Sequence, residues 1–238
     1  MAEKYQAIMF DLDGTLLPMD MDEFTKGYFG YLYSTTAAPL GYAKETFVPA
    51  MWKGVSAMVK NDGTRKNSEA FWETFEAITG IPSKDKAKKF DEFYKGDFNK
   101  AKAFTQPTPL AVKAVEAARE KAEAVALATN PLFPRVAVES RVTWTGISPA
   151  AFDYITDYDN STSCKPNPAY YLEIAKKLNL DPARCLMIGN NAQEDIEAAS
   201  EAGFDTYLVT DCLINERETL PDCKKGSLAD CVEYLKSL

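Results

Sequence analysis

The sequence contains no histidine among its 238 residues. This absence excludes Ser-His-Asp and Cys-His catalysis, and it removes the most common zinc ligand. Without an imidazole, any general acid or base must be a carboxylate, a lysine, a tyrosine or a cysteine. The missing residue type narrows the possible chemistry before any motif is considered.

Three further features are absent or weak. The five cysteines form no C-x-x-C pair and are odd in number, so we expect reduced thiols in a cytoplasmic protein. No apolar run approaches membrane-spanning length, and the first predicted strand begins too close to Met1 to leave room for a signal peptide. The net charge is -8 and no basic stripe stands out. We therefore expect neither a nucleic-acid nor a membrane partner.

The most informative segment lies near the amino terminus. Tyr5–Phe10 is an apolar run that predicts a buried strand, and Asp11, Asp13 and Gly14 follow it in a predicted turn. In open α/β sheets, ligands bind beyond the carboxyl ends of the strands, where both aspartates are expected. Two acids at this place favour divided roles, one as nucleophile or metal ligand and one as proton carrier. An Asp-Gly turn that only ends a strand is the structural alternative.

Downstream of residue 104 the sequence alternates between strand and helix patterns. Short apolar runs predict strands at Ala124–Ala128, Tyr154–Thr156, Cys185–Ile188 and Thr206–Val209. Apolar spacing predicts helices at Pro109–Lys121, Pro168–Leu178 and Ala192–Ala202. Such alternation predicts an α/β fold with a doubly wound parallel sheet.

Residues 18–103 break this alternation, because they show helical patterns without a clear strand. The predicted helices are Phe24–Tyr33, Lys44–Lys60, Ser68–Ile78 and Lys84–Phe98. We therefore predict a core domain of residues 1–17 and 104–238, with an inserted helical domain at residues 18–103. The insert holds 13 basic and 12 acidic residues and 15 of the 28 aromatic residues, of which a few are expected to line a pocket.

Four motifs follow one another in a recognisable order. They are Asp-Leu-Asp-Gly-Thr at 11–15, Thr129, Lys165 just before a predicted helix, and Gly189–Asp195. In this order and spacing the chain resembles the haloacid dehalogenase-like hydrolase superfamily, whose members are mostly phosphatases. The resemblance covers the whole core, implies a Rossmann-like catalytic domain, and identifies the insert with the family's helical cap.

The resemblance also implies a role for each motif residue. Asp11 would attack phosphorus and form an aspartyl-phosphate, while Asp13 would protonate the leaving oxygen and then activate water. The implied phosphate-binding residues are Thr129, Asn130 and Lys165. The implied ligands of a Mg²⁺ cofactor are Asp11, Asp13 through its backbone carbonyl, Asn190 and Asp195. Such a plan suits phosphoryl transfer, which needs neutralisation of negative charge more than covalent manipulation.

Each of the later residues also has a structural interpretation. Thr129 could simply end a strand, Lys165 could be an exposed loop lysine, and Asn130 could hold a turn. The position of Lys165 before a helix start favours phosphate binding, because helix N-termini attract anions. Asn191 and Glu194 have the spacing of a reciprocal cap at a helix start, and Asp195 could interact favourably with the positive end of the helix dipole.

One residue departs from the family pattern. The family's metal motif usually has an acid directly after the glycine, but Asn190 follows Gly189 here. An amide oxygen can bind Mg²⁺ without contributing a negative charge, so weaker metal binding is expected.

The function predicted from these residues is Mg²⁺-dependent hydrolysis of a small phosphate ester by a cytoplasmic, monomeric protein. A haloacid dehalogenase, a phosphomutase and a non-catalytic phosphate-binding module are the alternatives. Asp13 counts against the dehalogenase because a halide needs no proton donor, whereas Asn190 counts mildly for it. The basic residues Lys53, Lys60, Arg65 and Lys66 of the insert could bind an anionic leaving group, although solvent exposure is the more common role.

Overall fold

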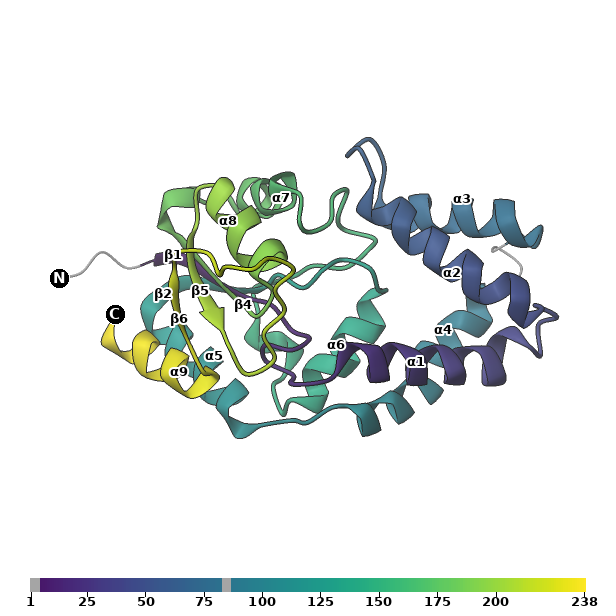
Figure 1. Ribbon diagram of the computed structural model, residues 1–238, viewed down its shortest axis with the longest axis horizontal. Helices are drawn as coiled ribbons and strands as arrows, with labels where there is room; N and C mark the ends of the chain where they lie inside the picture. Colours follow the sequence, from purple (N-terminus) through teal and green to yellow (C-terminus); the bar gives the residue numbers. More distant parts are fainter. Residues whose placement is uncertain (1–4, 83–86) are drawn as a thin grey trace.

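A six-stranded parallel sheet forms the centre of the larger part of the molecule (Figure 1). The computed structural model describes residues 5–82 and 87–238. Its sheet has the order β3-β2-β1-β4-β5-β6, and every neighbouring pair is parallel. The strands are β1 (Tyr5–Phe10), β2 (Ala122–Leu127), β3 (Tyr154–Ile155), β4 (Cys185–Gly189), β5 (Asp205–Val209) and β6 (Lys224–Gly226). The α/β fold with a doubly wound parallel sheet is thus confirmed.

Helices cover both faces of this sheet. They are α5 (Pro109–Lys121), α6 (Arg135–Trp144), α7 (Pro168–Leu178), α8 (Ala198–Glu201) and α9 (Leu228–Ser237). Alternate side chains of β1 point to opposite faces, as a strand requires. Ile8 and Phe10 belong to the cluster that includes residues of α5 and α9, whereas Ala7 and Met9 pack with residues of α7 and α8.

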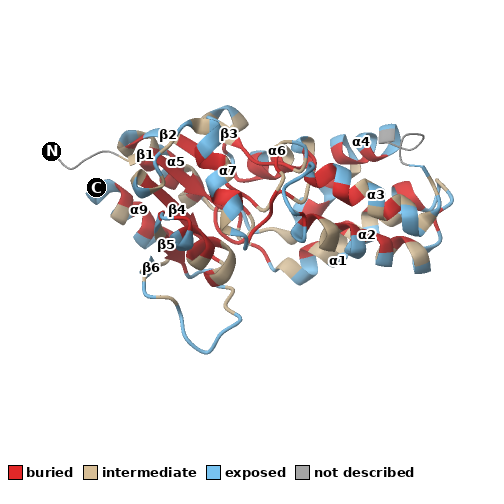
Figure 2. Cartoon of the chain, turned by 90° about the horizontal axis from the view of Figure 1, so that it is seen from above, coloured by how far each residue is buried: buried red, intermediate tan, exposed pale blue. Residues whose placement is uncertain are grey.

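A second group of helices lies at the other end of the molecule, between β1 and α5 in the chain (Figure 1). It consists of α1 (Met21–Leu32), η1 (Tyr33–Ala37), α2 (Lys44–Val59), α3 (Asn67–Thr79), α4 (Ala87–Lys95) and η3 (Asp97–Phe104). The predicted helix Lys84–Phe98 begins in residues outside those described, and its described part divides at Gly96 into α4 and the start of η3. Buried residues continue from the sheet into these helices (Figure 2). We keep the division into a core and a cap at residues 18–103 as a proposal.

Two chain connections join the cap helices to the sheet, and they lie side by side. Met19 and Thr105 form an isolated antiparallel bridge, and the Gln106 amide donates to the Pro18 carbonyl at 2.7 Å. A third contact comes from the start of α3, where the amides of Asn67 and Ser68 donate to core carbonyls, both at 2.9 Å. These amides belong to the first turn of a helix, which has no partner for them within the helix.

Most predicted elements are present, and the differences have local reasons. Helices α5 and α7 have the predicted bounds, and the side chains of Thr108 and Asn167 cap their N-termini. Strand β6 was not predicted because its sequence, Lys-Lys-Gly, carries no apolar signal. The predicted helix Ala192–Ala202 divides into a π-helical segment, η6 (Ala192–Glu197), and α8. None of the helices in the described part of the chain is long and apolar enough to cross a membrane.

Candidate active site

Asp11 follows β1 and contacts a buried lysine from a distant segment. Lys165 Nζ lies 2.8 Å from Asp11 Oδ1 and 2.6 Å from Asp195 Oδ1. Lys165 is 1% exposed, which rules out the interpretation as a surface loop lysine. β1 and β4 are neighbours whose onward connections lead to opposite edges of the sheet, so the site lies at the point where ligands bind in such folds.

Asn190, the residue that departs from the family pattern, is fixed at both ends of its amide. Its Oδ1 accepts a hydrogen bond from Thr15 Oγ1 at 2.9 Å, and its Nδ2 donates to the Cys212 carbonyl at 2.6 Å. The largely exposed loop between β5 and β6 supplies this carbonyl (Figure 2). Gly14 passes so close that a Cβ there would lie 2.4 Å from Asn190 Nδ2, and its φ of +89° also favours glycine.

Asp195 is held against the end of β4. A Cβ on Gly189 would lie 2.2 Å from Asp195 Oδ2, so only glycine leaves room for this carboxylate. The same Oδ2 accepts the Asn191 amide at 2.9 Å. Asn191 Oδ1 caps the segment by accepting the amides of Gln193 and Glu194. The predicted reciprocal cap is therefore half wrong, since Asp195 and not Glu194 returns the hydrogen bond to Asn191.

Asp13 forms an ion pair that sequence reasoning missed. Its Oδ2 accepts a hydrogen bond from the guanidinium of Arg141 on α6, and its Oδ1 is buried without a partner among the described residues. Arg141 is 1% exposed and stacks 4.2 Å from the ring centre of Phe133. Phe133 in turn lies 5.4 Å, between ring centres, from Tyr28 of the cap. No motif marks Arg141, and an arginine on an amphipathic helix usually faces water.

Thr129 and Asn130 follow β2 and line the same cavity as the two aspartates. The Thr129 carbonyl accepts hydrogen bonds from Tyr170 and Thr156 at 2.8 and 2.7 Å, which fixes the backbone here. Asn130 Nδ2 donates to Glu194 Oε2 at 3.1 Å, while its buried Oδ1 has no partner among the described residues. The tertiary structure therefore brings all seven predicted site residues to one end of the sheet.

Burial and charge shift the titration of three of these groups. Burial by itself would lower the pKa of Lys165, but the carboxylates of Asp11 and Asp195 raise that pKa well above its usual value. Burial raises the pKa of Asp195 to about 7, against the opposing effect of Lys165. Burial also raises the pKa of Asp13, and Arg141 acts in the opposite direction. Lys165 therefore stays charged at neutral pH, as an anion-binding residue must.

The donor set can be compared with the needs of Mg²⁺, which prefers oxygen ligands. Asp11 Oδ2 and Asn190 Oδ1 both lie within hydrogen-bond distance of Thr15 Oγ1, at 3.2 and 2.9 Å, so two suitable oxygens converge on one region. The unpartnered Asp13 Oδ1 adds a third buried oxygen nearby. Both oxygens of Asp195 already accept hydrogen bonds. Among the residues that the structure describes, no cluster of three acidic or cysteine side chains could hold a metal. The oxygens present fit Mg²⁺ with Asn190 in place of a third acid.

A cavity of about 1130 Å³ extends from these residues into the cap. Its floor includes Asp11, Asp13, Thr129 and Asn190, and its other walls come mainly from α1 and α2, with residues of α3 and α4. The arrangement places a nucleophilic carboxylate and a second carboxylate in the wall of a large pocket, with a buried cation in contact with the first of them. It suits nucleophilic attack by Asp11 on a substrate that the cap surrounds.

The family model for haloacid dehalogenase-like hydrolases matches residues 5–203. The chain therefore belongs to this family of hydrolases. Comparison with curated proteins gives no match.

Solved structures of the same fold include enzymes of different specificity. A 2-haloacid dehalogenase from Pseudomonas syringae aligns with a TM-score of 0.63 and 18% identity, covering 98% of this chain and 99% of that one. A HAD phosphatase from Thermococcus onnurineus aligns with a TM-score of 0.60 and 16% identity, covering 97% of each chain. The HAD-hydrolase YfnB from Bacillus subtilis, bound to magnesium, aligns with a TM-score of 0.60 and 15% identity, over 98% and 99% of the two chains. At these identities the likeness shows the fold, and the choice between the activities must come from the site.

Proposed function

We propose that this hydrolase is a Mg²⁺-dependent phosphatase that cleaves a phosphate monoester through an aspartyl-phosphate on Asp11. The observation that carries the proposal is the second carboxylate, Asp13, whose buried Oδ1 has no partner among the described residues and lines the cavity beside Asp11. An alcohol leaving group needs a proton donor at this place, whereas a halide does not.

In the proposed reaction, an oxygen of Asp11 forms a bond to phosphorus as the bond from phosphorus to the ester oxygen breaks. Asp13 gives its proton to the departing alcohol, and it later removes a proton from the water that attacks the aspartyl-phosphate. That second attack releases phosphate, restores the carboxylate of Asp11 and returns Asp13 to its protonated form. Lys165 stays charged throughout and balances the negative charge of the phosphoryl group.

A Mg²⁺ ion held by Asp11, Asn190 and the backbone of Asp13 would neutralise further phosphoryl charge. Asp195 is better placed to position Lys165, because Lys165 occupies one of its oxygens and a backbone amide the other. We therefore propose three ligand residues for the metal, and a positioning role for Asp195 in place of the predicted role as a ligand.

The test compares hydrolysis of p-nitrophenyl phosphate and of an alkyl phosphate, with and without Mg²⁺. Asp11→Asn should abolish both reactions because an amide is a poor nucleophile. Asp13→Asn should slow the alkyl phosphate by about 10²- to 10⁴-fold and the activated aryl phosphate by less. Asp159→Asn, which changes an exposed aspartate that does not line the cavity, serves as the control. An Asp11→Asn variant as active as the parent would refute the assignment.

Dehalogenation is the second candidate, because Asn190 leaves the described site without a cluster of three acids. The same preparation should therefore be incubated with 2-chloropropionate. Chloride release that depends on Asp11 but not on Asp13 or Mg²⁺ would favour this candidate over the phosphatase. Release of neither phosphate nor chloride, with retained binding of phosphate, would favour a binding module. Transfer of the phosphoryl group to a second hydroxyl of the substrate would indicate a mutase.

A further inference from the structure

We infer that the alcohol part of the substrate is a bulky, aromatic group without negative charge. This inference rests on the proposed phosphatase activity and adds the class of substrate to it. It differs from the small metabolite that the sequence suggested. Three observations support it: the size of the cavity, the composition of its cap-side wall, and the placement of its charges.

The cavity is much larger than a small metabolite needs. Its volume of about 1130 Å³ lies just above the range of about 300–1,000 Å³ that is common for drug-sized ligands. A phosphoryl group bound at Asp11 occupies only a small part of it. The space that remains is lined by residues of α1, α2, α3 and α4, and an alcohol of two or three carbons would leave most of it to water.

The cap side of the cavity is strongly aromatic. The rings that line it include those of Phe24, Tyr28, Trp52, Phe71, Trp72 and Tyr94. Trp52 is 52% exposed although it is one of the largest apolar side chains, and its ring lies 5.3 Å from that of Phe29, which also lines the cavity. An exposed tryptophan at the wall of a pocket beside a catalytic site is typical of a surface that binds an apolar ligand.

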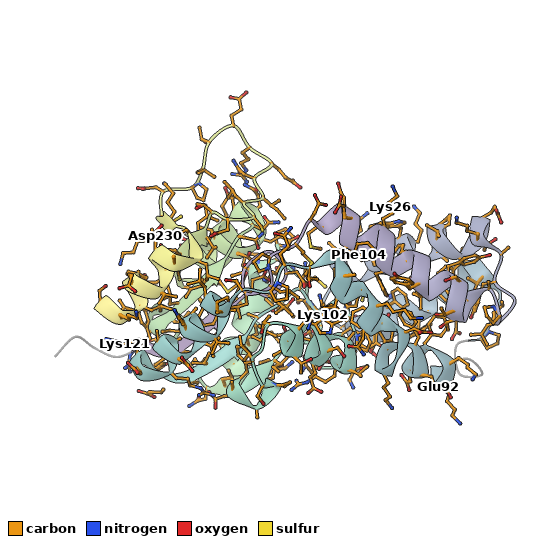
Figure 3. The ribbon with its side chains drawn as sticks, turned by 90° about the horizontal axis from the view of Figure 1, so that it is seen from below. Lys26, Glu92, Lys102, Phe104, Lys121 and Asp230 are labelled. Atoms are coloured by element: carbon orange, nitrogen blue, oxygen red, sulfur yellow. The ribbon has the colours of Figure 1, made fainter. Side chains whose placement is uncertain are left out.

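The charges of the cavity do not suit a second anionic group. The basic residues that line its described wall are Lys26 and Lys44, and both are exposed. Figure 3 shows Lys26 on the outer side of α1, with its side chain directed away from the body of the molecule. The buried cations Lys165 and Arg141 already bond to carboxylates. A carboxylate or second phosphate on the alcohol would therefore be buried without a partner, which is costly.

The four basic cap residues that the sequence suggested as anion-binding do not supply a partner for a second anionic group. Lys60 and Arg65 line a separate depression of about 400 Å³, together with Asn61, Asp62 and Thr64. Lys53 and Lys66 are exposed and line neither pocket. The exposed carboxylates Asp22 and Glu216 line the main cavity and would repel an anion. An uncharged aromatic alcohol meets no such repulsion.

The test uses three alkyl phosphates whose ester bonds have nearly equal reactivity: 3-phenylpropyl, propyl and 3-carboxypropyl phosphate. We expect kcat/KM for the phenylpropyl ester to exceed that for the propyl ester by about 10- to 100-fold, the range that corresponds to burying a phenyl ring. The carboxypropyl ester should be hydrolysed more slowly than the propyl ester. Equal rates for the phenylpropyl and propyl esters, or a preference for the carboxypropyl ester, would overturn the inference while leaving the phosphatase proposal intact.

Substitution of Trp52 tests whether the aromatic wall causes the preference for the phenylpropyl ester. Trp52→Ala should remove most of the preference for the phenyl ring. Trp52→Phe should keep most of the preference. Val59→Ala is the matched control, because Val59 is an exposed apolar residue of the same helix that does not line the cavity. If Trp52→Ala kept the full preference, the aromatic wall would not be the binding surface.

A binding measurement separates failure of this inference from failure of the proposed function. Phenylpropylphosphonate and propylphosphonate have no ester bond, so calorimetry can compare their affinities without turnover. We expect the phenylpropyl compound to bind more tightly, by a factor that Trp52→Ala reduces. Tighter binding without hydrolysis of any ester would retain the apolar binding site and refute the phosphatase. Hydrolysis of the esters without a difference in phosphonate binding or in kcat/KM would retain the phosphatase and refute the aromatic binding site.

Discussion

Asn190 makes two side-chain hydrogen bonds, and a carboxylate could reproduce only the one that its Oδ1 accepts from Thr15. Its Nδ2 donates to the Cys212 carbonyl, and the side chain is only 2% exposed. An aspartate would place an oxygen against that carbonyl and bury a charge. The amide therefore ties the loop after β5 to the end of β4, which explains the departure from the family pattern better than a simple loss of metal affinity does.

We predict opposite effects of Asn190→Asp without and with Mg²⁺. Without the metal, the free energy of unfolding should fall by about 1–3 kcal/mol, because the Cys212 carbonyl loses its donor. With Mg²⁺ the introduced charge should strengthen metal binding and recover part of this loss. Urea unfolding at several Mg²⁺ concentrations measures both effects.

The neighbouring Asn191→Asp variant is the matched control. Asn191 Oδ1 only accepts hydrogen bonds from the amides of Gln193 and Glu194, which aspartate can also do at an N-cap. Its metal-free stability should therefore stay close to that of the parent. Unchanged metal-free stability of Asn190→Asp would mean that the hydrogen bond to Cys212 contributes little.

At the scale of elements, the start of α3 holds the cap against the loop that carries Lys165. Asn67 is fully buried, and its Nδ2 donates to the Ser163 carbonyl and to Cys164 Sγ at 3.1 and 3.2 Å. The paired connections at Met19 and Thr105 lie elsewhere along the chain and are suited to act as a hinge. We predict that the cap moves relative to the core about these two connections.

We predict that Asn67→Ala loosens this contact. The Ser68 amide, which donates to the Tyr158 carbonyl, should exchange its hydrogen about 10-fold faster or more, because the side-chain bonds next to it are lost. Hydrogen exchange of the native protein provides the measurement. Thr64→Ala is the control, since Thr64 bonds to Asp62 within its own loop. Equal exchange at Ser68 in Asn67→Ala and the parent would show that the backbone bonds alone hold the contact.

Across the whole molecule, the five cysteines are unpaired and differ in burial. Cys164, Cys185 and Cys231 are buried, and burial raises the pKa of Cys185 and of Cys231 to about 12. Burial also raises the pKa of Cys164 far above its usual value. Cys212 and Cys223 are partly exposed.

We predict that a thiol reagent titrates two cysteines of the native protein quickly and all five after unfolding, because only the accessible thiolate reacts. Cys164 should be the first of the three buried thiols to react, since opening of the cap exposes it while Cys185 and Cys231 need unfolding of the core. Mass spectrometry of partly labelled protein identifies the order. Simultaneous reaction of the three buried thiols would indicate that cap and core open as one unit.

Apolar patterning and local motifs were enough to predict the parallel sheet, the helices within residues 18–103 and the motif residues at the ends of the strands. These features depend on apolar periodicity and on residues close together in the chain, such as Tyr5–Phe10 with Asp11 and Asp13. Such patterns did not predict that Ala192–Ala202 divides into two helical segments, because capping contacts decide this division. They also did not predict the short strand β6, because its position at the edge of the sheet decides its formation.

The partners of the site residues, in contrast, become visible only in the tertiary structure. The bond between Arg141 and Asp13 joins positions 128 residues apart, and the bond between Asn190 and Cys212 depends on how one loop returns to the sheet. The aromatic cavity likewise arises where residues of four cap helices, α1 to α4, face the core. Hydrophobic patterning selects which side of a helix is buried, but it does not select which buried groups meet, because that depends on packing across the whole chain.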